Sequence, residues 1–263
     1  MTYSTDLVPI EKAVTEGNHT MNLLTDELSV GNGLNVAPGT WEFDAAVATE
    51  FNSHVAKSVP LYEDLQTLAV QISDFFIPKY GLIIDLGCST GTTIIKLLDR
   101  HQKKNLRILG IDNSAPMLAE AHKTLDIFPN VQLEEQNIVF CSLPKAHLIY
   151  SLYSLQFIDL EYRQSVVDKI YNSLHEGGAF ILVEKVLDDN SAISEIYQLC
   201  HWENKQYVGG FTPSEILGKA QSLRGRMRPL STEENLQMLK DIGFRHTSTF
   251  FKWCNFVGIL AIK

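Results

Sequence analysis

The sequence predicts an α/β fold, in which a Rossmann-like, seven-stranded and mostly parallel sheet ends in an antiparallel hairpin. Short apolar runs such as residues 82–86 alternate with segments of helical period, which is typical of a parallel sheet with right-handed crossovers. The first of these runs meets a turn with glycines at 87 and 91, and a helical pattern follows at once. Residues 244–251 and 256–262 are predicted to be two final strands, close enough along the chain to pair antiparallel.

Length, charge and cysteine content limit the class of protein. The 263 residues suit one domain of ordinary size with additions. A net charge of −9, from 31 acidic and 22 basic residues, argues against sustained contact with nucleic-acid phosphates. No apolar run approaches the ~20 residues that span a bilayer, and a basic-then-apolar signal pattern is missing at the N-terminus. The four cysteines form no C-x-x-C pair, which indicates reduced thiols and no structural zinc. We therefore expect a cytoplasmic protein without a metal, a membrane or a nucleic acid as partner. The sequence leaves open whether the protein forms a homodimer.

Residues 1–40 are polar and contain four glycines, with a weak helical period only around residues 21–28. They are predicted to form either a frayed tail or a lid over the ligand. The ligand-binding domain is predicted to span residues 41–263.

Two helices are predicted before the first strand of the sheet. Val47, Phe51 and Val55 recur at four-residue intervals, and Pro60 then interrupts the chain. A second amphipathic helix follows over residues 61–76, and Tyr62 at its start faces either the ligand or the core. This pair is expected to form a helical cover over the carboxyl ends of the strands.

The remaining elements alternate. Ser114 is a predicted helix cap, and a turn at residues 175–178 is expected to end a helix. A helical insert at about 188–241 is expected after the fifth strand. Further strands are predicted at 107–112, 130–135, 147–152 and 178–185, and a helix is predicted at 162–174.

The turn at residues 87–91 is the candidate ligand site. In an α/β sheet, the join between a strand and a helix N-terminus faces the ligand, and Gly87 and Gly91 allow close approach of the main chain. The pattern departs from the dinucleotide fingerprint, because Ser89 stands where a second glycine would be. Asp85 would repel a phosphate but suits a ligand with an ammonium group.

A second carboxylate narrows the ligand. Asp112 ends the predicted strand 107–112, 21 residues beyond Gly91, where an acid hydrogen-bonds ribose hydroxyls. A ligand with a ribose, no phosphate and an amino-acid tail is S-adenosylmethionine. The alternatives are a nicotinamide-binding Rossmann protein and a chance glycine turn.

These residues resemble the class I methyltransferase superfamily, and more specifically the carboxy-S-adenosyl-L-methionine synthases, enzymes of tRNA wobble-uridine modification. The similarity covers nearly everything after residue 40. It is carried by WEFD (41–44), SVPLY (58–62), DLGCS (85–89), DNSAPM (112–117), LQF (155–157), DKIY (168–171) and CNF (254–256).

The resemblance implies a set of cofactor contacts. The backbone of residues 87–89 would accept the methionine end, Asp112 would hold the ribose, and the other polar residues would contact adenine. Asn137 stands where the family has aspartate, and an amide can still donate to and accept from adenine. The implied contacts are Tyr62, Gly87, Cys88, Ser89, Asp112, Asn113, Asn137 and Ile138.

Two departures concern the reaction. The family binds the added carboxylate with an arginine where this chain has Ala220, and Leu152 replaces an asparagine. A charge-assisted contact is thereby lost. Arginines at 224, 226 and 228 either substitute or are solvated at the surface. We therefore expect an inherited pocket and a changed reaction.

The pocket is expected to be aromatic around the sulfonium, which cation–π attraction stabilises. Its candidate catalytic residues are Tyr62, Tyr153, Tyr207 and His201, and Leu152 and Phe211 would add apolar surface. His201 acts either as a catalytic base or only in the structure of the fold.

Three functions remain open. The first is a methyltransferase that moves an alkyl group from the sulfonium to a small molecule, without a metal. The second is a synthase that modifies S-adenosylmethionine itself, either by cyclisation to azetidine-2-carboxylate and methylthioadenosine or by forming carboxy-S-adenosylmethionine. The third is a non-catalytic S-adenosylmethionine-binding regulator.

Overall fold

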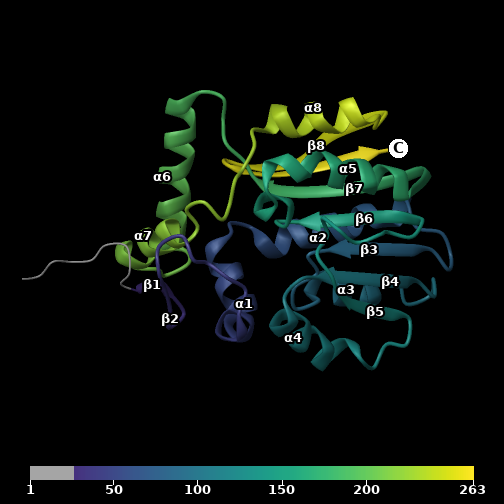
Figure 1. Ribbon diagram of the computed structural model, residues 1–263, viewed down its shortest axis with the longest axis horizontal. Helices are drawn as coiled ribbons and strands as arrows, with labels where there is room; N and C mark the ends of the chain where they lie inside the picture. The colour runs from purple at the N-terminus through teal and green to yellow at the C-terminus, as the bar shows by residue number, and fades with distance from the viewer. Residues whose placement is uncertain (1–26) are drawn as a thin grey trace, which may run out of the picture.

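A seven-stranded sheet forms the centre of the protein in the computed structural model, which describes residues 27–263 (Figure 1). Its strands lie in the order β5-β4-β3-β6-β7-β9-β8. Neighbouring strands from β5 to β7 pair in parallel, whereas β9 pairs antiparallel with both β7 and β8. The predicted fold class, including the C-terminal hairpin, is therefore confirmed. The strands are β3 (Leu82–Leu86), β4 (Arg107–Asp112), β5 (Val131–Glu135), β6 (Ala146–Leu152), β7 (Leu174–Lys185), β8 (His246–Trp253) and β9 (Phe256–Ile262).

Helices cover both faces of this sheet. Ile94 and Leu97 of α3 pack with α2 and α4 on one face, and Val167 and Ile170 of α5 pack with α8 on the other. The central strand β3 is buried along its whole length, which explains its continuous apolar run. The helices are α1 (Ala45–Ser58), α2 (Tyr62–Ile72), α3 (Thr92–Arg100), α4 (Ala115–Leu125), α5 (Leu160–Ser173), α6 (Ser191–Tyr207), α7 (Pro213–Ser222) and α8 (Thr232–Ile242), with 3₁₀ turns η2 (Ser73–Phe75) and η3 (Leu155–Phe157).

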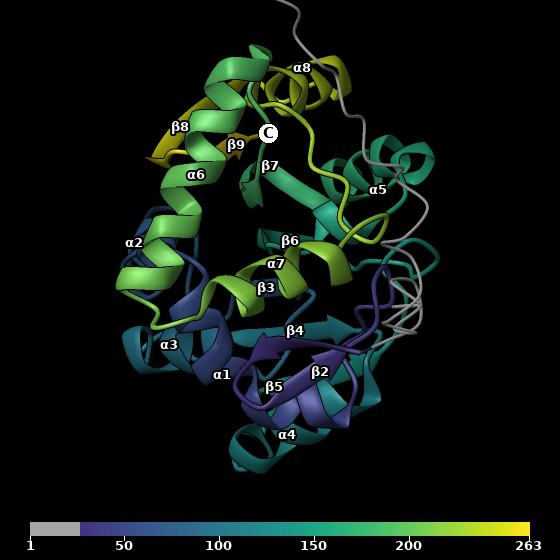
Figure 2. The same cartoon turned by 90° about the vertical axis from the view of Figure 1, so that its left-hand side faces the viewer.

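The chain leaves β3 for β4 and β5 on one side and returns to β6 on the other. Such a reversal of strand order opens a crevice at the carboxyl ends of the strands, where ligands bind in this type of sheet. Figures 1 and 2 show α1, α6, α7 and the β1–β2 pair gathered at one end of the sheet.

The predicted N-terminal helical cover is present as α1 and α2. Asp44 caps α1 by accepting a hydrogen bond of 2.9 Å from the Val47 amide. α1 ends two residues before Pro60, and α2 starts at Tyr62 after Leu61, which has a left-handed φ of 52°.

The N-terminal 40 residues contain structure that was not predicted. Strands β1 (Leu28–Gly31) and β2 (Leu34–Val36) form an antiparallel pair that packs against α7. Asn32 and Gly33 at its turn both have positive φ, so the Asn-Gly dipeptide was the missed hairpin signal. The expectation of a frayed tail is therefore wrong for residues 28–36. Residues 1–26, which include most of the weak helical period at 21–28, lie outside the described residues, and the alternative of a lid stays a prediction.

The start of β7 also differs from expectation. The predicted helix-ending turn at 175–178 lies inside β7, whose first residue Leu174 pairs with Ala146 before Leu148 pairs with Ala179. The segment between these pairs bulges out of the ladder, because Gly177 adopts a φ of 73°.

The helical insert after β7 forms as predicted, with α6, α7 and α8. Capping boxes begin the last two helices, through Thr212 with Glu215 and Ser231 with Glu234. α8 returns to cover the sheet beside α5, so only α6 and α7 stand at the carboxyl ends of the strands. Among residues 27–263, no helix combines the length and the apolar character needed to cross a membrane.

Candidate active site

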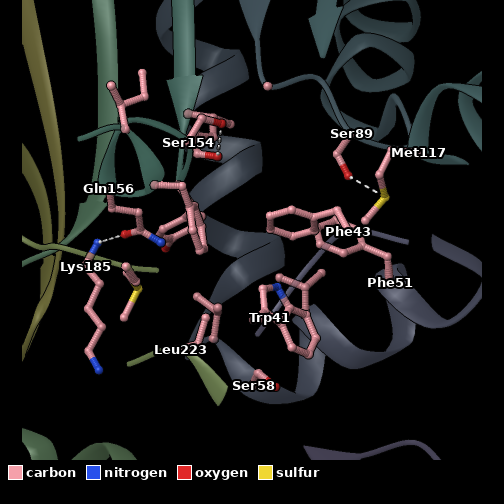
Figure 3. A pocket seen from close by; sticks show the side chains of 18 of the residues that line it. Trp41, Phe43, Phe51, Ser58, Ser89, Met117, Ser154, Gln156, Lys185 and Leu223 are labelled. Atoms are coloured by element: carbon pink, nitrogen blue, oxygen red, sulfur yellow. Dashed lines mark hydrogen bonds between the residues drawn. The ribbon is translucent and has the colours of Figure 1, made fainter. Parts of the chain in front are cut away.

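A cavity of about 880 Å³ lies at the carboxyl ends of β3, β4 and β6. Residues of α1, α2, α6 and α7 complete its walls, so segments far apart in the sequence enclose one space. Ligand pockets commonly measure about 300–1,000 Å³. Figure 3 shows Ser89 and Met117 on one side of this space and Gln156 and Lys185 on the other.

The glycine turn after β3 forms one wall. Gly87 has a φ of 74°, and a Cβ there would collide with the Ser154 hydroxyl. Gly91 does not line the cavity; a Cβ at Gly91 would lie 2.5 Å from Leu125 Cδ1, so this glycine allows the turn to pack against α4.

The amides of this turn bond inside the protein. Gly87 and Cys88 donate to the Ile111 carbonyl at 2.7 and 3.1 Å. Ser89 donates to Asp112 Oδ2 at 2.9 Å. A phosphate site would need such amides free to face the ligand. The three bonded amides therefore do not suit the pyrophosphate of a nicotinamide dinucleotide.

Two carboxylates lie at this wall. Asp85 is 2% exposed, and burial, followed by the nearby Asp112, raises its pKa to about 7. Asp112 is held from both sides, because its second oxygen accepts from the Ser114 amide at 2.9 Å. The Asp112 side chain is thus fixed at the end of β4, and its role as a ribose acceptor stays a prediction.

Asn113, Asn137 and Ile138 also line the cavity. Asn137 Oδ1 accepts a hydrogen bond of 2.9 Å from the Val139 amide, an Asx turn. This bond holds the side chain in place and leaves the amide NH₂ group and one lone pair of the oxygen for other partners.

The aromatic wall is built by Tyr62 and Tyr153. Their rings stack with centroids 6.2 Å apart, and Tyr153 also meets Phe256 edge-on. Tyr62 accepts from Gln66 Nε2 at 3.0 Å, whereas the buried Tyr153 hydroxyl has no hydrogen-bond partner among residues 27–263. Burial raises the pKa of both phenols, so both stay protonated at neutral pH.

Backbone strain is present beside the cavity, at three of the seven non-glycine residues with positive φ among residues 27–263. Leu61, Ser89 and Tyr153 are non-glycine residues with φ between 52° and 60°. Such left-handed residues cost about 1–3 kcal/mol each and cluster at functional sites. Their positions agree with a ligand site at this end of the sheet.

His201 lines the cavity as predicted, but its state does not suit a base. Its Nε2 donates to the Ser58 carbonyl at 3.0 Å, and its ring meets Phe256 edge-on. Burial, followed by Lys205 and Lys185, lowers its pKa to about 3. His201 is therefore neutral at pH 7 and binds a proton only weakly.

Two aromatic predictions are wrong. Tyr207, in the last turn of α6, is 78% exposed and lies outside the cavity lining. Phe211 is buried but packs against Gly31 and His54 instead of lining the cavity. Both errors concern residues at the turn between α6 and α7, whose orientation no periodic pattern in the sequence encodes.

Of the three candidate arginines, only Arg224 lines the cavity, with Ala220 and Leu152. Arg226 pairs with Glu42 at 3.1 Å and Arg228 with Asp159 at 3.1 Å. These two arginines are bound at the surface.

Sequence analysis missed much of the lining, including five residues that carry or stack on polar groups. Trp41 and His54 enter from the N-terminal side, and Lys185, Lys205 and Lys219 from β7, α6 and α7. Trp41 opens the WEFD segment of the resemblance, but no sequence pattern marked it or the other four as lining residues, so only the fold brings them together. Within residues 27–263, no group of three or more His, Cys, Asp or Glu side chains is placed to hold a metal ion.

Comparison with known proteins agrees with this geometry. A family model described as a methyltransferase domain matches residues 83–178. The structure of human N-acetylserotonin methyltransferase in complex with S-adenosylmethionine superposes with a TM-score of 0.57 at 16% identity, covering 84% of this chain and 56% of that longer chain. The fold and the site thus define an enzyme of the class I methyltransferase fold, the class that uses S-adenosylmethionine.

Full-length relatives give the family. The chain is 37% identical over 235 residues to carboxy-S-adenosyl-L-methionine synthase of Staphylococcus epidermidis, covering 88% of this chain and all of that protein. It is 38% identical to the enzyme of the same name from Campylobacter lari, covering 85% and 94% of the two chains. The chain therefore belongs to the carboxy-S-adenosyl-L-methionine synthase family.

Proposed function

We propose that the protein is an S-adenosylmethionine-dependent transferase whose second substrate is a small molecule enclosed in the same cavity, with methyl transfer as the first candidate reaction. The supporting observation is the cavity itself. Its volume of about 880 Å³ lies near the upper end of the range for small-molecule pockets, which leaves room beside one cofactor. Its walls of α1, α2, α6 and α7 suit a small acceptor rather than a macromolecule.

The residues of the glycine turn and β4 would bind the cofactor. Asp85 suits the ammonium group, Asp112 suits the ribose, and Asn113 and Asn137 suit adenine. When bound, S-adenosylmethionine supplies an electrophilic carbon beside a positively charged sulfur. Tyr62 and Tyr153 would place aromatic faces near that charge, which favours its binding. Water exclusion and positioning of the acceptor are then the main tasks of the cavity.

Carboxy-S-adenosylmethionine formation is the second candidate. It is favoured by the 37% identity that extends over the whole Staphylococcus epidermidis enzyme of that name. The changes at Ala220 and Leu152 speak against an unchanged carboxylate site, because neither side chain can pair with an anion.

Mass spectrometry separates these reactions. The protein is incubated with S-adenosylmethionine alone and then with a metabolite extract. S-adenosylhomocysteine that forms only with the extract supports methyl transfer, and a carboxylated cofactor supports the second candidate. Methylthioadenosine without any acceptor would indicate cyclisation. No product, despite calorimetric binding, would overturn the proposal in favour of a regulator.

A further inference from the structure

Gln66 is a buried amide in the cavity wall near the glycine turn. It lies within α2, is 2% exposed and lines the cavity. Its amide nitrogen donates to the Tyr62 hydroxyl at 3.0 Å and to the Thr93 hydroxyl at 3.3 Å. These bonds use both hydrogens of the amide group. The amide oxygen therefore faces away from the two hydroxyls, and it has no hydrogen-bond partner among residues 27–263.

An unpartnered oxygen at this position is costly for the ligand-free protein. Buried polar atoms are nearly always hydrogen-bonded, because a buried acceptor without a donor has lost its contacts with water. Leu65 and Ala69, which pack into the core from the same helix, are apolar and fully buried. An apolar side chain would suit this packing as well, so the amide of Gln66 indicates a ligand that donates a hydrogen bond to this wall.

Asp85 adds a second acceptor to the same wall. Thr93, which binds Gln66, stands in the first turn of α3, after the glycine turn that follows β3 and its Asp85. Burial, followed by the charge of Asp85, raises the pKa of Tyr62, so the carboxylate also lies near the other hydroxyl that binds Gln66. Within residues 27–263, no basic side chain forms an ion pair with Asp85. A carboxylate and a free amide oxygen suit an ammonium group, which has three N–H donors and a positive charge.

We propose that Gln66 is a specificity-determining residue of the cofactor site, and that its side-chain oxygen accepts a hydrogen bond from the α-ammonium group of S-adenosylmethionine. The inference rests on the proposed function in one respect, which is the placement of that ammonium group beside Asp85. Gln66 lies outside every segment that carries the family resemblance, between SVPLY (58–62) and DLGCS (85–89). The shared segments therefore do not account for this contact, which depends on the packing of α2.

The two acceptors have different tasks. Asp85 attracts any cation that enters, whereas the Gln66 oxygen has one orientation, fixed by the bonds of the amide to Tyr62 and Thr93. An analogue without the ammonium group leaves this oxygen buried and unpartnered, and sites of that kind reject ligands that lack the matching donor. Tyr62 also stacks on Tyr153 with ring centroids 6.2 Å apart, so one network joins the amino-acid end of the cofactor site to its aromatic wall.

Calorimetry of the full chain tests the contact with three ligands and matched variants, arranged as a double-mutant cycle. S-adenosylhomocysteine carries the amino-acid tail of the cofactor and has no group to transfer. Its deaminated analogue keeps the carboxylate and lacks the ammonium group, and its decarboxylated analogue has the opposite change. Gln66→Met removes the amide with little change in volume. Gln71→Met, at an exposed glutamine of the same helix, is the matched control.

Gln66→Met should weaken S-adenosylhomocysteine and its decarboxylated analogue at least about tenfold, the effect of losing a hydrogen bond to a charged group. The deaminated analogue should bind Gln66→Met and the unaltered protein alike, because it cannot make the contact. Its binding also shows that the variant is folded, since it requires the intact cavity. Gln66→Glu keeps an acceptor oxygen at this position and should retain the preference for the ammonium group. Gln71→Met should bind all three ligands as the unaltered protein does.

Each other outcome has a defined meaning. Unchanged affinities in Gln66→Met, or equal weakening of all three ligands, would overturn the contact and leave Gln66 as a support for Tyr62. A loss confined to the two ligands that carry the carboxylate would overturn it too, because the amide nitrogen would then face the ligand. If Asp85→Asn abolishes the preference for the ammonium group and Gln66→Met does not, the placement of the cofactor stands and this inference alone fails. An unaltered protein that binds the deaminated analogue as tightly as S-adenosylhomocysteine would instead refute the placement of the ammonium group.

Discussion

Replacing Asp112 by alanine tests the placement of the cofactor. The Asp112 carboxylate is fixed by amide hydrogen bonds of 2.9 Å from Ser89 and Ser114, so it presents its remaining acceptor capacity to the cavity. A hydrogen bond to a charged group contributes about 1.5–3 kcal/mol. Asp112→Ala should therefore weaken S-adenosylmethionine by about 10- to 150-fold.

Isothermal titration calorimetry measures this change, with Glu135→Ala as the control. Glu135 is an exposed carboxylate that stands opposite Asp112 in the β4–β5 ladder, so its removal deletes the same charge at a nearby position. The control should bind S-adenosylmethionine normally. Asp112 also holds the glycine turn, so its removal could lower the stability of the fold. Urea unfolding of each variant therefore separates a loss of folding stability from a loss of the contact with the cofactor. Unchanged affinity in Asp112→Ala, or an equal loss in Glu135→Ala, would refute this placement of the ribose.

Four further predictions follow from the cavity. Gly87→Val should abolish S-adenosylmethionine binding in calorimetry, because the valine Cβ would collide with the Ser154 hydroxyl and displace the turn. Normal binding by this variant would show that the ligand does not need the close approach of the Gly87 main chain. Burial raises the pKa of Asp85 from 3.8 to about 7, so the ionised form destabilises the ligand-free protein. The free energy of unfolding in urea should thus decrease as pH rises from 3.8 towards 7, and Asp85→Asn should flatten that slope. With its net charge of −9, the protein should not shift tRNA in a gel at physiological salt, and a salt-sensitive shift would argue against a small-molecule substrate. Unmodified S-adenosylmethionine should bind more tightly than its carboxylated form, and Ala220→Arg should reduce this difference in affinity. If the unaltered protein prefers the carboxylated form, a cation of the cavity such as Arg224 or Lys219 already binds the carboxylate.

The sheet and the acidic residues at one end of the cavity could be predicted from the sequence alone. Both depend on signals that are local or periodic: the apolar run 82–86, the glycine turn after it and the acid that ends β4. In an α/β sheet the carboxyl ends of neighbouring strands meet at one edge, so the positions of Asp85 and Asp112 along the chain are enough to place them together. The hairpin at 28–36 carries a comparable local signal in Asn32-Gly33, although a polar tail or lid was predicted there.

The residues of the other cavity walls could be identified only from the packed structure. His54, Lys185, Lys205 and Lys219 come from α1, β7, α6 and α7, and their burial arises because these elements converge over one crevice. A lysine on an amphipathic helix has the same local pattern whether it faces solvent or a cavity. The orientation of the α6–α7 turn likewise removed Tyr207 from the site. Burial and charge pairing are properties of the packed assembly, so residue spacing along the chain does not encode them.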